Sequence, residues 1–340
     1  FSGAVLAGSL GRGSLGEEDT ALATRLVYGV LSAEGTLDEA IDRHVTRAVE
    51  PRVRDVLRIA SFELLFSRAP AYAVVDQAVE LTRGIRPQAA GLVNAVLRRI
   101  AEDAATFPWG DPQTDRDALA RVSAHPRWIV DVAVASLGET AAREMLACGL
   151  EPAPSYVRVN PFERDRTSTL DGLAEAHPSP SPPDADCFVL GRPARAFSAQ
   201  SEASGWFPMD AAAQIAPAAV APRPGAEVLD VGSGRGNKTI CLQALAVRSD
   251  GAAAITALEV HEGKAKALRE QLDRSRVPAV GVRVADAREL EHEFGPDAFD
   301  AVLLDAPCSG LGTLRRYPEK RWRLDSAAPA RLSALQSEML

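Results

Sequence analysis

The chain has 340 residues, a formal net charge of −8 and an ordinary apolar fraction of 46%. This length allows two or three domains, and the negative charge excludes a general nucleic-acid coat protein while leaving room for a local basic site. The four cysteines lie far apart in the sequence, which argues against a zinc site or a disulfide framework. No apolar run reaches the length of a membrane span. We therefore expect a cytoplasmic protein that needs neither membrane nor metal.

The N-terminal third of the chain has the apolar spacing of successive helices. Apolar side chains recur three and four residues apart over 20–31, after Pro51, over 71–81 and after Pro87. Proline is typical of the first turn of a helix, as at Pro51. Because only short breaks separate these segments, the pattern predicts a compact all-α bundle over residues 1–106.

The next region, residues 115–204, mixes helix and strand. A proline- and glycine-rich linker is predicted over 107–112, and helical spacing then continues over 116–150. Residues 155–160 alternate like a strand, and a second short strand is predicted over 187–190. The pattern predicts a small α/β module.

From residue 205 the pattern becomes that of a doubly wound parallel sheet. Apolar strands are predicted at 228–231, 254–258, 280–284 and 299–304, with helical segments between them. A β-α-β alternation of this kind makes the strands parallel. We therefore predict an open α/β domain over 205–340, with ligands bound at the carboxyl ends of its strands.

A glycine-rich loop, DVGSGRGNKT, follows the first of these strands at Asp230–Thr239. Glycines let a backbone turn sharply and approach a ligand closely. A P-loop needs a glycine directly before Lys238, and a dinucleotide-binding fingerprint needs its third glycine there, but Asn237 occupies that position. The third interpretation, D-x-G-x-G-x-G, is matched in full and resembles the loop of class I S-adenosylmethionine-dependent methyltransferases.

Two acids follow the second and third predicted strands. Glu259 stands where a carboxylate accepts the ribose hydroxyls of a nucleoside, and Asp286 stands where such folds address the adenine. A solvated carboxylate at a strand end is the alternative interpretation for each acid taken singly. Their shared edge with the glycine loop favours a nucleoside site.

The fourth strand runs into the sequence DAPCSG at Asp305–Gly310. An acid can hydrogen-bond the amino edge of a cytosine, and a thiolate can add to or leave from a pyrimidine ring. Taken alone, these residues could equally form a turn after a strand.

The sequence from this motif onward resembles the RNA (cytosine-5)-methyltransferases of the Sun/Nol/Nop type. The residues that carry the resemblance beyond Gly310 are Gly312, Arg315, Arg316, Pro318, Lys320, Trp322, Gln336, Ser337 and Glu338. The helical front, with NAVLRR at 94–99, is similar to the NusB fold. The resemblance implies a multidomain protein: an all-α NusB-like RNA-binding bundle, a small α/β module, and an incomplete Rossmann-like class I methyltransferase domain that lacks its C-terminal strands.

The resemblance also implies roles for individual residues, beginning with S-adenosyl-L-methionine as the cofactor. Asp305 would contact both the cofactor and the target cytosine, Cys308 would help to release the methylated base, Glu259 would hold the ribose and Asp286 the adenine. The residues implied for the methionine part are Gly232, Ser233, Gly234, Arg235, Gly236, Asn237 and Lys238.

Small-subunit ribosomal RNA is the partner that the resemblance implies, and we expect a monomer. The implied reaction is methylation of C5 of a cytosine through a covalent adduct between a cysteine and C6. Basic side chains are the candidate phosphate contacts, with a solvated charged face as the alternative: Arg98, Arg99, Arg315, Arg316, Lys320, Arg321 and Arg323.

Two features depart from the family's pattern. The family's loop usually reads A-x-P-G-G-K-T, whereas Asn237 here precedes Lys238. The family's nucleophile is a second cysteine, in a Thr-Cys pair after the next strand, and the chain reaches Leu340 before any such strand. We expect this main nucleophilic cysteine beyond Leu340. We therefore expect no turnover by the chain as printed. Two alternatives stay open: a non-catalytic RNA-binding or assembly protein that keeps the fold, and an enzyme that uses Cys308 itself as nucleophile, as DNA cytosine methyltransferases use their Pro-Cys.

Overall fold

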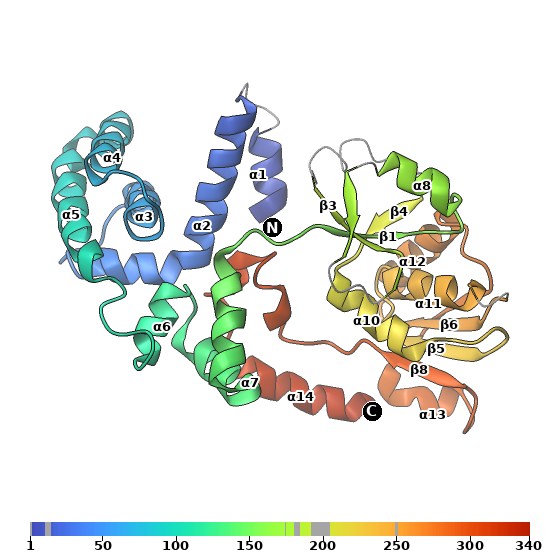
Figure 1. Cartoon of the computed structure of the whole chain (residues 1–340). Helices are drawn as coiled ribbons and strands as arrows, with labels where there is room; N and C mark the ends of the chain where they lie inside the picture. The colour runs from blue at the N-terminus through green and yellow to red at the C-terminus, as the bar shows by residue number, and fades with distance from the viewer. Residues whose placement is uncertain (1, 11–14, 174, 180–183, 192–204, 249–250) are drawn as a thin grey trace. The chain divides into compact units, whose positions relative to one another are not determined.

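The computed structural model describes residues 2–10, 15–173, 175–179, 184–191, 205–248 and 251–340 (Figure 1). It divides into two compact units. The helical unit comprises Phe1–Ala153 with Ser309–Ala328, and the sheet unit comprises Pro154–Cys308 with Pro329–Leu340. The predicted module over 115–204 is thus shared between the two units, and its predicted end at residue 204 lies outside the described residues. No helix within the described ranges is both long and apolar enough to span a bilayer.

The helical unit contains the helices that the apolar spacing predicts and, before them, α1, which the spacing did not predict. Its long elements are α1 (Ser2–Leu10), α2 (Glu17–Asp42), α3 (Pro51–Phe66), α4 (Ala71–Ile85), α5 (Ala90–Asp103), α6 (Arg116–Val122) and α7 (Arg127–Ala147). Short 3-10 turns follow α4, α5 and α7, at η1 (Pro87–Ala89), η2 (Ala104–Thr106) and η3 (Cys148–Leu150). Pro51 is the first residue of α3, as predicted, and the Glu50 side chain caps the helix by accepting from the Arg52 amide.

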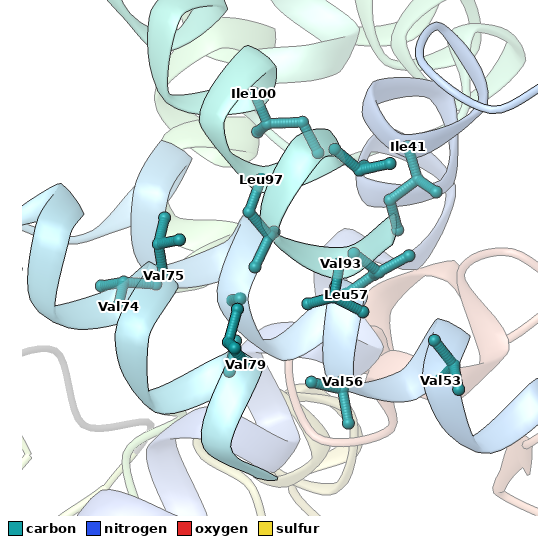
Figure 2. Packing of buried hydrophobic residues seen from close by; sticks show 13 residues of the cluster. Ile41, Val53, Val56, Leu57, Val74, Val75, Val79, Val93, Leu97 and Ile100 are labelled. Atoms are coloured by element: carbon teal, nitrogen blue, oxygen red, sulfur yellow. The ribbon is translucent and has the colours of Figure 1, made fainter. Parts of the chain in front are cut away.

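A large aliphatic cluster lies in the core of the bundle, between α3, α4 and α5 (Figure 2). Leu57 of α3 and both Val93 and Leu97 of α5 are completely buried in it. Side chains three and four residues apart share one helix face, which is why the periodic positions of α3, α4 and α5 meet here. This confirms the helical spacing that the sequence predicts.

The predicted linker over 107–112 is not an isolated tether. Trp109 donates its indole N–H to the carbonyl of Asp103 at 3.1 Å, and the guanidinium of Arg43 stacks 3.7 Å from the ring centroid. Phe107 packs edge-on against both Trp109 and Phe66. The segment connects η2 to α6, and these contacts pack it against the bundle.

The sheet unit contains two four-stranded sheets. The first is antiparallel with the order β2-β3-β1-β4, formed by β1 (Tyr156–Val159), β2 (Ala176–Pro178), β3 (Cys187–Leu190) and β4 (Trp206–Pro208), and α8 (Arg166–Gly172) follows β1. The second is parallel with the order β7-β6-β5-β8, formed by β5 (Glu227–Val231), β6 (Ala254–Glu259), β7 (Val280–Val284) and β8 (Ala301–Leu304).

Helices cover both faces of the parallel sheet (Figure 1). Side chains of α10 (Ala211–Val220), α11 (Asn237–Val247) and α12 (Glu262–Arg274) pack on one face. The other face is covered by η4 (Ala287–Glu289), α13 (Leu290–Glu293) and the end of α14 (Ala328–Met339), whose Met339 joins Leu229 and Val231 of β5. Since β5 alternates its side chains between the faces, Val228 packs with the first group.

Candidate active site

The strand order places the glycine loop and the DAPCSG motif next to each other. The chain goes from β5 outward to β6 and β7 on one side, and β8 then pairs with β5 on the other side. A crevice forms at such a switch point, outside the carboxyl ends of the two strands where the order reverses. Residues after β5 and after β8 therefore share one edge.

The backbone of the glycine loop requires its glycines. Gly232, Gly234 and Gly236 all have positive φ, at 78°, 57° and 84°. A Cβ on Gly232 would lie 2.5 Å from the Asp305 carbonyl oxygen, and one on Gly236 would lie 2.5 Å from Leu268. A Cβ on Gly234 would meet only the loop's own backbone, at 3.8 Å. The loop is thus packed against Asp305 at Gly232 and against α12 at Gly236, whereas a side chain at Gly234 would make only an ordinary contact with the loop itself.

Asp230 holds the base of this loop. It is completely buried, and its Oδ2 accepts from the Thr239 hydroxyl at 2.5 Å, while its own carbonyl accepts from the Ser233 hydroxyl. Burial raises the pKa of Asp230 above its ordinary value. In the sequence, Asp230 was recognised only as the first residue of the D-x-G-x-G-x-G pattern. Its hydrogen bond with Thr239, nine residues later and across the loop, was not predicted.

Lys238 and Asp305 form an ion pair between the loop and the motif. Lys238 lies in the first turn of α11, and Asp305 directly follows β8, where its amide donates to the Val231 carbonyl at 2.9 Å. The structure therefore brings together two of the predicted site residues that lie 67 positions apart in the chain. Asn237, the departure from the family's loop, donates its amide to the carbonyl of Pro208 at 3.1 Å.

The two acids predicted to bind the nucleoside lie at the carboxyl ends of the neighbouring strands β6 and β7, but their surroundings are different. Glu259 is the last residue of β6, is only 5% exposed and accepts from the His261 amide at 3.1 Å. Asp286 follows β7, and both of its oxygens accept from Arg288, at 3.1 and 2.7 Å. The hydrogen bonds from Arg288 lower the pKa of Asp286 to about 2.

Cys308 is the exposed cysteine of the sheet unit, on the short loop that starts at Asp305. Cys187 and Cys241 are buried, and burial raises the pKa of the Cys241 thiol to about 12. Among the cysteines of this unit, Cys308 is thus the one available to react with a substrate.

The predicted RNA contacts fall into two groups. Arg98 and Arg99 are exposed on α5. In the segment Ser309–Ala328, Arg315 donates to the carbonyls of Glu151 and Pro152, Arg316 is half-buried, and Lys320 lies 4.6 Å from the centroid of the Tyr317 ring.

Arg321 requires a correction. It is completely buried in the helical unit, and its guanidinium donates to the carbonyls of Ala124 and Gly149, at 2.8 and 3.0 Å. A phosphate contact at Arg321 is incompatible with this position, because all of the side chain is enclosed by protein.

Comparisons with known proteins agree with this architecture. The NusB family model matches residues 2–102, and the model of the 16S rRNA methyltransferase RsmB/F family matches residues 217–340. The ribosomal RNA small subunit methyltransferase B of Salmonella paratyphi B is 30% identical over 333 residues, covering 95% of this chain and 75% of the relative. The protein of the same name from Salmonella newport gives the same values.

Two solved structures share the fold. The crystal structure of PH0851 superposes with a TM-score of 0.70 at 23% identity, covering 96% of this chain and 74% of that one. NSun6 from Pyrococcus horikoshii, solved with SFG, gives a TM-score of 0.52 at 16% identity, covering 63% of this chain and 78% of its own.

The matched families and the fold together define a methyltransferase with a Rossmann-like domain and a NusB-like helical region, which confirms the predicted fold class. The relatives are similar along nearly the whole chain. The chain belongs to the 16S rRNA methyltransferase RsmB/F family, and the Salmonella proteins named ribosomal RNA small subunit methyltransferase B are similar to it over 95% of its length.

Proposed function

We propose that this protein methylates C5 of a cytosine in small-subunit ribosomal RNA, with S-adenosyl-L-methionine as methyl donor. The observation that carries the proposal is the juxtaposition of Lys238 of the glycine loop with Asp305 of the DAPCSG loop, three residues before an exposed Cys308. The names of the relatives support ribosomal RNA as the substrate. A cytoplasmic location follows from that substrate, and we propose that the protein acts as a monomer.

The residues at the switch point fit the methyl donor. The loop after β5 offers its backbone at Gly234, where an added Cβ would meet only the loop itself, and the nearly buried Glu259 offers a carboxylate to ribose hydroxyls. Asp286 would address the adenine from the end of β7 after its pairing with Arg288 rearranges. When bound, the donor supplies an electrophilic methyl group on a sulfonium.

The proposed chemistry proceeds through the RNA base. The thiolate of a second cysteine, in the family's Thr-Cys pair, would add to C6 and form an S–C6 bond. C5 would then be nucleophilic enough to take the methyl group, as the methyl–sulfur bond of the donor breaks and a neutral thioether leaves. Asp305 holds the amino edge of the cytosine. A base then removes the C5 proton, the S–C6 bond breaks and the thiolate leaves, with Cys308 assisting this release. An unstacked base in an RNA loop reaches such a site at little cost.

Replacing Cys308 by alanine is expected to trap the RNA. Protein that carries the Thr-Cys pair, incubated with the labelled donor and unmodified small-subunit rRNA, should place label at C5 of one cytosine. The Cys308→Ala variant should accumulate a covalent protein–RNA band on denaturing gels and lose turnover by about a hundredfold or more. If the variant forms no adduct and no product, Cys308 is itself the nucleophile. Label on any other atom would overturn the proposed reaction.

Replacing Gly232 by alanine is expected to weaken binding of the donor at least about tenfold, because a residue forced into positive φ costs about 1–3 kcal/mol and its Cβ meets the Asp305 carbonyl. Titration calorimetry with S-adenosyl-L-methionine measures the effect. Gly263→Ala is the matched control: Gly263 lies in α12 with nothing within 4 Å of an added Cβ. Equal affinities of the two variants would contradict the proposed cofactor site.

The same titration separates the proposal from a non-catalytic RNA-binding protein. That alternative draws support from Asn237, whose side chain is committed to the Pro208 carbonyl where the family has glycine. Specific RNA binding without any affinity for the methyl donor would favour it.

A further inference from the structure

The peptide between Pro307 and Cys308 is held by the C-terminal helix of the sheet unit. Gln336 of α14 donates its side-chain N–H to the Pro307 carbonyl at 2.7 Å. At the start of the same loop, the Asp305 amide donates to the Val231 carbonyl of β5 at 2.9 Å. The residues between β8 and Cys308 are therefore fixed at two points, by a strand and by a helix.

The hydrogen bond from Gln336 has a large effect on the backbone because its acceptor belongs to a proline. The ring of Pro307 fixes its φ and removes its N–H, so rotation about ψ is the one soft backbone torsion left to it. That rotation moves the Pro307 carbonyl and swings the following Cα, which carries the Cys308 side chain. A hydrogen bond to this carbonyl thus restrains the position of the Cys308 Cα and, through it, the region that the thiol can reach.

The helix that carries Gln336 is itself anchored. Met339 lies three residues on, on the same face of α14, and packs against a cluster that includes Leu258 and Leu304. Glu338 lies 3.6 Å from Arg288, the residue that holds Asp286. The packing of α14 therefore holds the side-chain amide of Gln336 in place.

We infer that Gln336 is a positioning residue for Cys308: its amide holds the Pro307 carbonyl so that the thiol faces the base to be released. This inference rests on the proposed role of Cys308 in release. It assigns Gln336 a part in the release step alone, since Gln336 contacts neither reacting atom.

Gln336→Met tests the inference, because methionine keeps the length of the side chain and removes the donor. The rate at which iodoacetamide alkylates Cys308 should rise at least about threefold, which is the effect expected when one hydrogen bond is removed. Mass spectrometry of the individual peptides measures this rate. Cys148, the exposed cysteine of the helical unit, is the internal reference and should not change. Ser337→Ala, which removes only a bond to the Ser333 carbonyl within α14, is the control variant.

A second measurement ties Gln336 to the reaction. In protein that carries the Thr-Cys pair, Gln336→Met should slow the decay of the covalent RNA adduct about five- to tenfold and lower kcat while leaving KM for RNA unchanged. Wild-type rates of both alkylation and adduct decay would overturn the positioning role and leave the role of Cys308 standing. If Cys308→Ala releases RNA normally, the proposed role of Cys308 fails, and the alkylation rates alone still decide whether Gln336 sets the thiol.

Discussion

Replacing Asp184 by alanine is expected to destabilise the antiparallel sheet of the sheet unit by about 3–5 kcal/mol, the usual cost of leaving one member of a buried ion pair without its partner. Arg158 of β1 is completely buried, and its Nη2 lies 2.8 Å from Oδ2 of Asp184. Its Nη1 donates to the Gln214 side chain of α10. Without Asp184, the guanidinium charge stays inside the protein, hydrogen-bonded to the neutral side-chain amide of Gln214.

The pH dependence of this pair has a definite sign. Burial raises the pKa of Asp184, but the hydrogen bond and charge of Arg158 more than offset this, so the pKa lies below its ordinary value of 3.8. A carboxyl group whose pKa is depressed by folding stabilises the protein above its unfolded pKa, and that stabilisation is lost as the pH falls through the folded value. Acid below about pH 4 should therefore reproduce part of the effect of Asp184→Ala.

Hydrogen exchange resolved by peptide is the measurement, because a protein with two units need not unfold in a single transition. Protection of the β1 and β3 peptides should fall in Asp184→Ala and recover partly in the Arg158→Met, Asp184→Ala double variant, where no unpaired charge is left. Asp171→Ala, at an exposed position of α8, is the matched control. Equal protection in Asp184→Ala and Asp171→Ala would show that the pair contributes nothing.

Replacing Arg321 by methionine is expected to release Ser309–Ala328 from the rest of the helical unit, at a cost of about 2–4 kcal/mol. The guanidinium joins three carbonyls from separate elements: Ser32 on α2, Ala124 before α7, and Gly149 in η3. Methionine fills most of the volume but leaves these buried acceptors without their charged donor. The neighbouring Trp322 reinforces the same attachment, because its indole N–H donates to the Ser32 carbonyl at 2.8 Å and its ring covers Gly35.

The buried charge has a visible electrostatic consequence. Burial and the charge of Arg321 lower the pKa of His125 to about 3, so His125 is neutral at physiological pH. Hydrogen exchange of peptides from α2 and from 309–328 should become faster in the Arg321→Met variant. It should not change in the Arg323→Met variant, because Arg323, two residues away, is exposed. Identical exchange in the two variants would show that Arg321 does not anchor the segment.

Most of the candidate site could be predicted from the sequence, because its residues lie at the ends of strands. Once parallel strands are predicted, their carboxyl ends must share an edge, and this rule placed Glu259 beside the glycine loop. The Lys238–Asp305 ion pair agrees with that expectation. The hydrogen bonds between Gln336 and Pro307 and between Arg288 and Asp286 could not be predicted, since they depend on how α14 and η4 pack.

The five basic residues over 313–323, Arg315, Arg316, Lys320, Arg321 and Arg323, form a basic strip in the sequence that local patterns alone could not interpret. Arg321 and Arg323 are the same residue type two positions apart, yet one is completely buried and the other is exposed. The carbonyls that receive the Arg321 guanidinium lie between 172 and 289 positions earlier in the chain. A local pattern contains no information about such distant acceptors, so the strip appeared uniformly available to phosphate.

By itself, the sequence determined the helical front, the doubly wound sheet, the glycine loop and the DAPCSG motif, because apolar periodicity and glycine spacing are local properties of the chain. The tertiary structure alone decided which charges are buried, that Ser309–Ala328 completes the helical unit, and that Gln336 holds the peptide before Cys308. These outcomes depend on burial and on hydrogen bonds between residues far apart in the sequence, which exist only after the chain has folded.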